Sequence, residues 1–319
     1  MKKLSLISVV VLAIVFCFSA VYADEPLRIG MSLTGSINDQ SWNQAGYEGL
    51  MMIKDEMGAE VAFQEQVPLS NVEESLRNYA AQGYDIVIGM GDQYSEAGKV
   101  VAEEYPETIF IVMSGIYTGD NLIATAMFDE KIAYVAGVTA ALMSDSGVIG
   151  YIGGMEIPPV IRNQIGYTNG AQSINPDIVV KSAVLGDFGD SAKGKEAAAA
   201  MIEQGADVIY YYVDNAMLGI FEAAREKEGV KLIGIMYDQS PLAPDLIITS
   251  VLQNTAASVL AVAKRAAAGE ITGETMLFGM DSGATGLAPF AESVPQDVQD
   301  KVQAVIDQIL AGELVIERE

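Results

Sequence analysis

The sequence predicts an α/β fold made of two doubly wound lobes, each with a mostly parallel sheet. Two observations carry this prediction. Short apolar runs alternate along the chain with amphipathic stretches of helical length, which is typical of strands and helices taking turns in a parallel sheet. Two segments also recur at nearly the same offset, which indicates that the second half of the chain repeats the topology of the first.

Seven short apolar runs predict strands, because each is bounded by polar or glycine-containing segments. The runs are 27–33, 85–90, 108–113, 147–152, 207–212, 231–236 and 246–251. Five amphipathic stretches between these runs predict helices, because their length and apolar spacing suit a helical face. These stretches are 43–56, 95–104, 131–142, 193–204 and 218–227.

The internal repeat predicts two lobes that face each other. Segment 43–49 recurs as 163–170, 120 residues later, and segment 82–88 recurs as 204–210, 122 residues later. In a doubly wound lobe, ligands bind beyond the carboxyl ends of the strands, where loops lead into helices. Two such lobes would enclose a cleft lined by these loops, so we expect the binding residues directly after the strands.

The N-terminus has the pattern of a secretory signal peptide. Lys2 and Lys3 precede an uncharged, mostly apolar run, 4–18, and small residues precede a cleavage point after Ala23. We therefore expect residues 1–23 to be removed and the mature chain to be periplasmic or otherwise extracytoplasmic. An uncleaved membrane anchor is the alternative, because the apolar run is close to the length that spans a bilayer.

Composition excludes several classes of function. The 319 residues carry a formal net charge of −25, which repels phosphate backbones and argues against nucleic acid as a partner. The chain has no histidine, which excludes Ser/His/Asp and Cys/His catalysis and histidine-ligated metals. The single cysteine, Cys17, lies in the expected signal peptide, so we expect no disulfide. Acylation of Cys17 is the less favoured alternative, because bulky residues precede it.

The chain carries no motif for a cofactor or for an enzyme. The glycine-rich segments 89–92 and 150–154 follow predicted strands, but neither has the glycine spacing of a dinucleotide fingerprint, and no P-loop occurs. No pair of carboxylates lies in a recognisable acid–base motif. We therefore expect a binding protein with no cofactor, no metal and no catalytic residue.

The loop after the first predicted strand holds the candidate binding residues of the first lobe. The only tryptophan, Trp42, ends this polar loop, and an aromatic ring in such a place packs either on a planar ligand or on its own lobe. Asn43 can both donate and accept hydrogen bonds, which suits the edge of a nitrogen heterocycle. Asp39 is a secondary candidate, although Asp39 or Ser41 could instead cap the following helix.

Loops farther along the chain supply the remaining candidates. Phe188 lies in a loop rich in glycine and aspartate in the second lobe, where it could face Trp42 across a cleft. Polar residues after three further strands could accept hydrogen bonds from ring amines or sugar hydroxyls, or could be ordinary turn and cap residues. These residues are Asp92, Asp214, Asn215 and Asp238.

Several motifs along the chain resemble one known family. They begin with Asp39-x-Ser41-Trp42-Asn43, continue through Tyr134-x-Ala136-Gly137 and 150–155, and end with 233–239. Together they are similar to the basic-membrane-protein (BMP) family of solute receptors, which serve ABC importers and whose best-known members are purine nucleoside receptors. The similarity extends over nearly the whole chain after residue 23.

The resemblance implies a type I periplasmic binding fold with two Rossmann-like lobes joined by a three-segment hinge. It places the N-terminal lobe at 24–128 plus about 252–278. It places the C-terminal lobe at 129–251 plus about 279–319. The implied partners are a small-molecule ligand and the membrane permease of an ABC importer, and we expect a monomer.

The resemblance also implies roles for four residues. In this family a purine base stacks between two aromatic side chains, at positions that correspond to Trp42 and Phe188. Asn43 corresponds to the asparagine that follows the first aromatic residue. Asp238 corresponds to an aspartate that binds ribose.

Departures from the nucleoside receptors affect the expected ligand. Those receptors carry lysine at the position of Gln253, so a charged donor to ribose is absent here, and Gln253 is a secondary candidate. The strand 110–114 ends in Ser114, where they carry aspartate. Trp42 and the segment 157–162, interpreted as a turn, look more like relatives that take free nucleobases. We therefore expect a purine base rather than a nucleoside.

Other interpretations of the sequence stay open. The same receptor fold could bind riboflavin or a pentose-like sugar, because stacked aromatics and carboxylates serve all of these ligands. A secreted nucleoside hydrolase is a remote alternative, because it needs clustered aspartates near the first strand and only Asp39 lies there. A signalling receptor that works without a transporter is a fourth interpretation.

Overall fold

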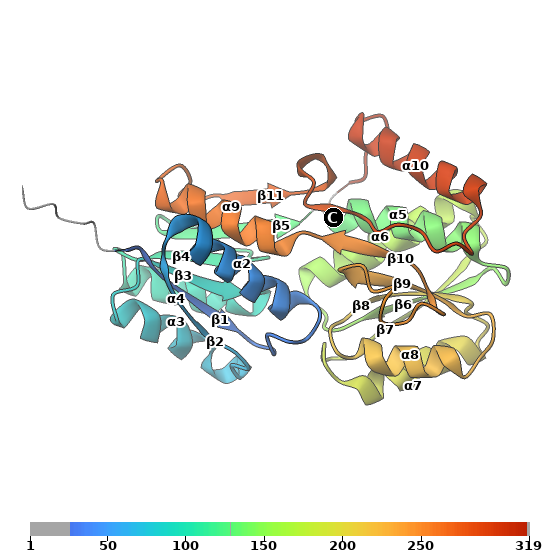
Figure 1. The fold of residues 1–319 in the computed structure, drawn as a ribbon, viewed down its shortest axis with the longest axis horizontal. Coiled ribbons are helices and arrows are strands. Elements are labelled where there is room, and N and C mark those ends of the chain that lie inside the picture. Colours follow the sequence, from blue (N-terminus) through green and yellow to red (C-terminus); the bar gives the residue numbers. More distant parts are fainter. Residues whose placement is uncertain (1–25, 128, 318–319) are drawn as a thin grey trace, which may run out of the picture.

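Two six-stranded sheets, one in each lobe, organise the chain (Figure 1). The computed structural model describes residues 26–127 and 129–317. The expected signal peptide, 1–23, and its Cys17 lie outside the described residues. Among the helices of the described part, none combines the length and the apolar character needed to cross a membrane.

The sheet of the first lobe is parallel throughout, in the order β11-β5-β4-β3-β1-β2. Its strands are β1 (Arg28–Leu33), β2 (Glu60–Gln64), β3 (Ile86–Met90), β4 (Ile109–Met113), β5 (Leu122–Met127) and β11 (Thr275–Phe278). The helices that cover it are α2 (Trp42–Met57), α3 (Val72–Ala81), α4 (Ser95–Glu104) and α9 (Thr255–Ala267). Short 3₁₀ turns, η1 (Leu69–Asn71) and η2 (Asp92–Tyr94), precede α3 and α4.

Alternating residues of the central strands divide the first lobe into two apolar layers. On β3, Ile86 and Ile88 belong to the cluster that α2 and α9 cover, whereas Val87 belongs to the cluster beneath α3 and α4. This division follows from the two-residue period of a strand, which points successive side chains to opposite faces. Continuous apolar runs of the kind that predict these strands therefore indicate a sheet buried on both faces.

The second lobe repeats this plan, with the strand order β12-β10-β9-β8-β6-β7. Its strands are β6 (Val148–Gly153), β7 (Val179–Val184), β8 (Val208–Tyr212), β9 (Lys231–Met236), β10 (Ile247–Gln253) and β12 (Thr285–Leu287). Only β12 is antiparallel to its neighbour among the described pairs. The remaining elements are α5 (Asp129–Met143), α6 (Pro158–Ile174), α7 (Ser191–Glu203), α8 (Met217–Arg225), η3 (Met280–Ser282) and α10 (Gln296–Leu310).

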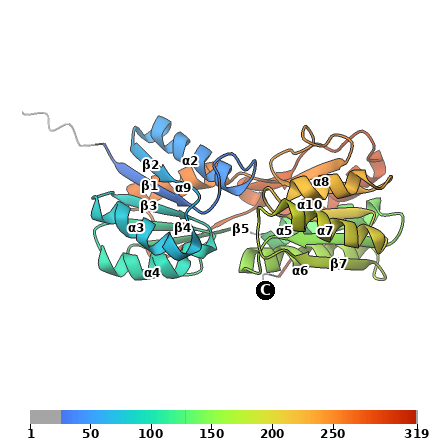
Figure 2. The same ribbon diagram turned by 90° about the horizontal axis from the view of Figure 1, so that it is seen from below.

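The two lobes share one topology, as the internal repeat predicts. The order β2-β1-β3-β4-β5 in the first lobe matches β7-β6-β8-β9-β10 in the second. Both views show the lobes side by side (Figure 1 and Figure 2), and Figure 1 shows α7 and α8 on one face of the second sheet and α5 and α6 on the other. The described chain passes between the lobes after β5, after β10 and after β11. The predicted fold class, an α/β fold with two doubly wound lobes, is confirmed.

The seven predicted strands are all present. The sequence prediction missed β5, which is buried inside its sheet, whereas the other missed strands, β2, β7, β11 and β12, lie at sheet edges. Both β2 and β7 lie at sheet edges, where several residues of each strand are exposed. The edge strand β11 is also largely exposed. Exposure admits charged and polar residues, so an edge strand loses the continuous apolar run that marks a central one.

The segment 157–162, interpreted as a turn, is the start of a helix. Helix α6 begins at Pro158, and Pro158 and Pro159 occupy its first two positions. Proline suits the first turn of a helix, because backbone N–H groups have no intrahelical partner there. The turn interpretation was wrong because a pair of prolines marks a helix start as readily as a loop.

Helices α5 and α6 of the second lobe pack unusually closely. A methyl group added at Gly170 would lie 2.0 Å from the carbonyl oxygen of Tyr134, and one added at Gly137 would lie 2.0 Å from that of Tyr167. Gly166 faces the carbonyl oxygen of Glu130 in the same way, at 2.3 Å. The glycines let one helix backbone approach the other, which places the start of α5 close to α6.

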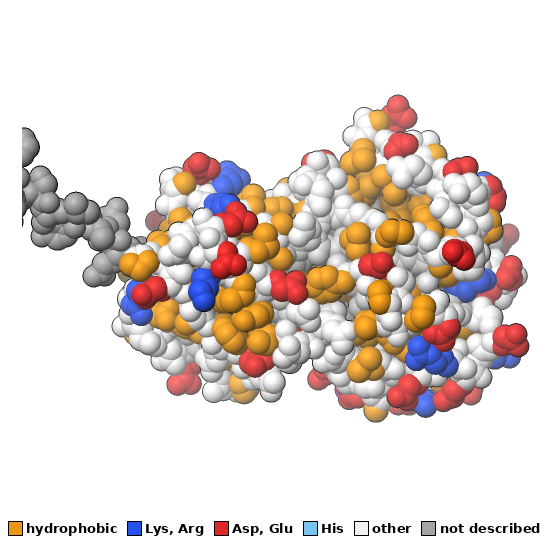
Figure 3. Space-filling model, in the orientation of Figure 1, with side chains coloured by type: hydrophobic (Ala, Val, Ile, Leu, Met, Phe, Trp, Pro, Cys, Tyr) orange, Lys and Arg blue, Asp and Glu red, His pale blue; other side chains and the backbone are white. Residues whose placement is uncertain are grey.

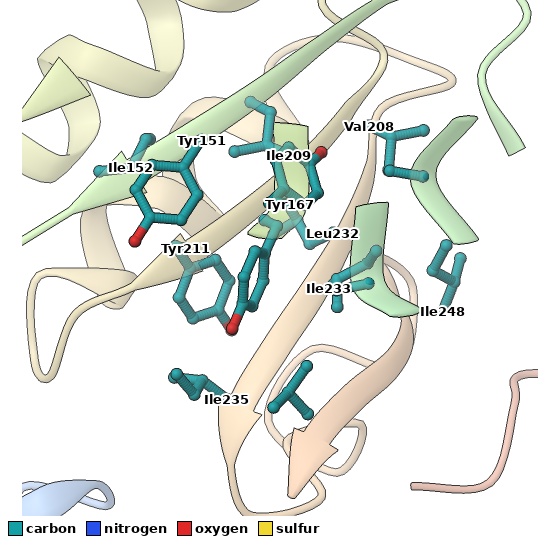
Figure 4. Packing of buried hydrophobic residues seen from close by; sticks show 14 of the residues in the cluster. Tyr151, Ile152, Tyr167, Val208, Ile209, Tyr211, Leu232, Ile233, Ile235 and Ile248 are labelled. Atoms are coloured by element: carbon teal, nitrogen blue, oxygen red, sulfur yellow. The ribbon is translucent and has the colours of Figure 1, made fainter. Parts of the chain in front are cut away.

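Aromatic rings fill the core beneath this helix pair. The rings of Tyr167 and Tyr210 lie 5.4 Å apart, and Tyr151 lies within 6 Å of both. Figure 4 shows Tyr151 and Tyr167 among aliphatic side chains from neighbouring strands. The hydroxyl of Tyr151 donates to the carbonyl oxygen of Val160, at 3.0 Å, which ties β6 to α6. This packing gives the second lobe a rigid wall behind the loops at its strand ends.

Replacing Gly170 by alanine should destabilise the protein by about 3 kcal/mol or more, because the added methyl group meets backbone that cannot rotate away. Chemical denaturation followed by circular dichroism measures the change. Gly286→Ala is the matched control, since no atom lies within 4 Å of the added methyl group. Equal stability of the two variants would contradict the close helix contact.

Candidate functional site

Two adjoining cavities lie between the lobes, at the carboxyl ends of the strands. We call the first the aromatic cavity, with about 550 Å³ of atom-free space, part of it open to solvent. It is lined by Thr34, Ser41, Trp42, Asn43, Gly91, Asp92, Gln93, Ser114, Ile157, Pro159, Phe188, Tyr212, Val213, Asp214, Ile235 and Met236. Both lobes contribute, as expected for a cleft between strand ends.

We call the second the acidic cavity, with about 720 Å³ of atom-free space that is likewise partly open. It is lined by Thr34, Gly35, Ser36, Asp39, Asn43, Leu69, Gln93, Met155, Gly186, Asp187, Phe188, Gly189, Asp214 and Asn215. Five lining residues are common to both cavities, so the two spaces adjoin. The shared residues are Thr34, Asn43, Gln93, Phe188 and Asp214.

Trp42 and Phe188, predicted to face each other across the cleft, both line the aromatic cavity. Trp42 is the first residue of α2 and packs partly against the apolar clusters of both lobes. Phe188 lies against Gly154, where an added methyl group would be 2.1 Å from its ring. The backbone carbonyl of Phe188 accepts hydrogen bonds from Asp214 and Ala216, which anchors its loop to the end of β8.

Asp39 holds the first loop onto α2 through four hydrogen bonds. Its carboxylate accepts from the backbone N–H groups of Ser41, Asn43 and Gln44, at 2.9 to 3.0 Å, and from the side-chain amide of Asn43, at 2.7 Å. Asp39 is buried, and each of its carboxylate oxygens accepts two of these hydrogen bonds. It therefore satisfies backbone donors at the start of the helix, where negative charge is favourable. The capping alternative for Asp39 is therefore the role that its contacts support.

Asn43 also serves the loop. Its side-chain oxygen accepts from the backbone N–H of Gly35, at 3.0 Å, while its amide donates to Asp39. The residue is buried yet lines both cavities. Since one amide hydrogen has no partner among these bonds, Asn43 keeps a donor for the cleft, and its predicted ligand role stays a prediction.

Asp92 lies at the first-lobe wall of the aromatic cavity, in the turn after β3. Its carboxylate accepts from the hydroxyl of Ser95, at 3.1 Å. Burial raises the pKa of Asp92, while the Ser95 hydrogen bond and the positive charge of Arg162 oppose the rise. Arg162 belongs to α6 of the second lobe and lies 3.9 Å from Glu130, so Asp92 has a cationic neighbour across the cleft.

Asp214 follows β8 and joins the lobes. Its carboxylate accepts from the backbone N–H of Trp42, at 3.4 Å, and from the hydroxyl of Ser41. Burial raises the pKa of Asp214 to about 7, and the negative charge of Asp39 adds to the rise. Asp214 therefore titrates near neutral pH.

A second contact between the lobes involves residues for which the sequence offers no signal. The hydroxyl of Tyr237 donates to the carboxylate of Glu48 on α2, at 2.8 Å. Burial and this hydrogen bond raise the pKa of Tyr237. Together with the Asp214 contact, this bond ties α2 to the second lobe.

Three of the predicted residues do not line the aromatic cavity. Asn215 lines the acidic cavity only. Asp238 is exposed and accepts from the backbone N–H of Ser240, at 3.0 Å. Gln253 is buried at the end of β10. Neither Asp238 nor Gln253 is among the residues that line the two cavities.

Two further lining residues have a backbone conformation that sequence patterns do not reveal. Ser114 and Met236 have φ values of 58° and 69°, in the left-handed region that non-glycine residues rarely adopt. They stand at the ends of β4 and β9, which occupy equivalent places in the two sheets. Backbone strain of this kind gathers at binding sites, so both positions belong to the site.

One face of the molecule carries charge of both signs. On the face in Figure 3, acidic side chains are scattered over both lobes and mixed with basic ones. Among the described residues, no group of three or more carboxylates, cysteines or histidines is placed to hold a metal ion.

Comparisons with known proteins point to one family. The chain matches the family described as ABC transporter substrate-binding protein, PnrA-like, over residues 27–318. It is 30% identical over 299 residues to a purine-binding protein of Brucella abortus, covering 92% of this chain and 84% of that protein. It is 26% identical over 305 residues to the transcriptional activator protein med of Bacillus subtilis, covering 95% of each chain.

A solved structure shares the fold. An ABC transporter solute-binding protein from Aeropyrum pernix superposes with a TM-score of 0.84 at 24% identity. The superposition covers 92% of this chain and 94% of that one. The predicted type I periplasmic binding fold therefore has a direct structural counterpart.

Asp214→Asn should stabilise the ligand-free protein at pH 8 by about 1–3 kcal/mol. Because the folded-state pKa of Asp214 is raised from 3.8 to about 7, the folded protein holds more protons than the unfolded chain between these values. The contribution of Asp214 to stability is therefore lost as the pH rises from about 4 to about 7.

Thermal denaturation at pH 5 and pH 8 measures this effect. The advantage of Asp214→Asn should be smaller at pH 5 than at pH 8. Asp177→Asn removes the same charge from an exposed position of the same lobe and should leave stability unchanged at both values. An Asp214 variant that is less stable than the parent at pH 8 would contradict the raised pKa.

Proposed function

Because this chain belongs to the family of PnrA-like ABC transporter substrate-binding proteins, also called the BMP family, we propose that it is a purine receptor. As a member of this family, it binds a small molecule and delivers it to a membrane permease. The finer proposal is that the ligand is a free purine base, bound in the aromatic cavity between the lobes.

The observation that carries the proposal is the meeting of Trp42 and Phe188 at one cavity. A planar ring bound there can contact both aromatic side chains, and each stacked pair adds about 0.5–1.5 kcal/mol beyond area burial. The purine-binding relative from Brucella abortus supports the same ligand class.

We expect a base rather than a nucleoside because the cavities offer few charged partners for ribose hydroxyls. Gln253 replaces the lysine that would donate to ribose and does not line either cavity. Asp238 is exposed and engaged in a local turn. Ribose hydroxyls would therefore lack two charged partners, and each such hydrogen bond adds about 1.5–3 kcal/mol.

The protein acts outside the cytoplasm in this proposal, as a monomer that docks on a permease after its lobes close. The signal-peptide pattern of residues 1–23 supports the location. Riboflavin or a pentose-like sugar is the second candidate ligand, because the aromatic rings and carboxylates of the cleft also suit them. A single binding panel separates these ligand classes.

We expect adenine or guanine to raise the melting temperature of residues 24–319, and their nucleosides to raise it less. Ligand that binds only the folded state stabilises it in proportion to the logarithm of concentration over Kd. Thermal shift and calorimetry against bases, nucleosides, riboflavin and pentoses make the comparison. Preference for nucleosides would contradict the base assignment, and a response to sugars alone would contradict the purine.

Trp42→Ala and Phe188→Ala should each weaken binding of the preferred purine by about 1–3 kcal/mol, the usual effect of removing a ring stacked on a base. Calorimetry with each variant measures the loss. The melting temperature of the ligand-free variants is the control, because a ring that serves the core instead would lower it sharply.

Gly154→Ala should weaken binding about tenfold, or about 1.4 kcal/mol, although it replaces no ligand-facing side chain. The added methyl group would lie 2.1 Å from the ring of Phe188, so the ring must leave its present position. Gly286→Ala, with no atom near the added methyl group, is the control and should bind like the parent. Unchanged affinity of Gly154→Ala would show that the placement of Phe188 does not matter.

A further inference from the structure

The two cavities carry charge of one sign. Four aspartates line them, and no lysine or arginine is among the described lining residues. The aspartates are Asp39, Asp92, Asp187 and Asp214. A site that holds carboxylates without lining cations disfavours phosphates and carboxylates as ligands and favours hydrogen-bond donors.

Three of the four aspartates already accept hydrogen bonds from neighbouring loop or helix residues of their own lobe. The carboxylate of Asp39 accepts four hydrogen bonds from its own loop and helix. Asp92 accepts from Ser95 and feels the charge of Arg162. The remaining one, Asp187, is exposed and accepts from the backbone N–H of Gly189, at 2.6 Å.

Asp214 is different in both place and partners. It is the single titratable residue common to the two cavities. It accepts from the hydroxyl of Ser41 and from the backbone N–H of Trp42 at 3.4 Å, the latter long for a hydrogen bond. The charged groups that face it, Asp39 and Asp187, are both acidic. No cation among the described lining residues balances its carboxylate, which lies where a ligand in the cleft can supply a further donor.

We propose that Asp214 determines ligand specificity by accepting hydrogen bonds from N–H groups of the bound heterocycle. The proposal rests on the proposed purine function and narrows it. The cleft then takes neutral or cationic bases that carry an exocyclic amine, and it discriminates against anionic solutes and against bases that present only acceptors. Two adjacent N–H groups would fit best, because a carboxylate can accept both at once.

The proposed hydrogen bond to Asp214 also predicts whether ligand binding releases or takes up a proton. The empty cleft disfavours the ionised carboxylate of Asp214, because burial and two acidic neighbours raise its pKa to about 7. A ligand N–H stabilises the ionised form. Binding a neutral amino-bearing base therefore releases a proton near pH 7, and affinity increases as the pH rises from about 6 to about 8.

Matched ligand pairs test the selectivity. Adenine is compared with unsubstituted purine, and guanine with hypoxanthine, so each pair differs by one amino group. We expect the amino-bearing member of at least one pair to bind about tenfold tighter or more, since a hydrogen bond to a charged group has that effect. Binding of all four without discrimination overturns the inference and leaves the purine receptor standing. Binding of none overturns both.

The variant Asp214→Asn tests whether the selectivity belongs to this residue. The ratio of the two affinities within the discriminating pair should fall to below about threefold. A role limited to holding the lobes together would instead lower both affinities and keep the ratio. Asp177→Asn, the exposed control of the same lobe, should keep both the ratio and the affinities of the parent.

Proton release gives an independent readout. Calorimetry at pH 7 in two buffers with different ionisation enthalpies counts the protons exchanged on binding. The parent protein and Asp177→Asn should release a fraction of a proton, and Asp214→Asn should release none. Proton uptake by the parent would mean that Asp214 donates to the ligand, which overturns the proposal.

Discussion

The carboxylate of Asp39 is the contact on which the rest of the cleft depends. Its four hydrogen bonds hold the first loop against the start of α2. Because α2 begins at Trp42, the same bonds fix the position of the Trp42 side chain and the direction of the Trp42 backbone N–H. Asp214 of the other lobe meets that N–H, so the approach of the lobes follows from the helix cap.

This arrangement has an electrostatic cost. Asp39 brings a negative charge to the place where Asp214 contacts α2, and this charge disfavours ionisation of Asp214. On the opposite wall, the positive charge of Arg162 favours ionisation of Asp92. Arg162 is not among the groups that shift the pKa of Asp214. Among the described residues that line the cavities, none supplies a positive charge that would balance Asp214.

Much of the fold was predictable from the sequence because central strands of a doubly covered sheet must be apolar throughout. The edge strands β2 and β7 escaped prediction because their faces meet water. The loop that holds Trp42 follows the end of a predicted strand, whereas the sequence indicates the loop of Phe188 only by the apolar run before it. The positive φ values of Ser114 and Met236, by contrast, depend on tertiary packing and leave no mark in composition or spacing.

The repeat also explains why the two lobes contribute different kinds of residue. Asn43 and Asn163 are equivalent in sequence, and both are buried. In the first lobe the helix begins one residue before Asn43, so a capped loop reaches the cavities. In the second lobe α6 begins at Pro158, and a full helical turn carries Asn163 away from the cavity lining. The second lobe supplies its aromatic side chain from the loop after β7 instead, so a duplicated topology encloses an asymmetric site.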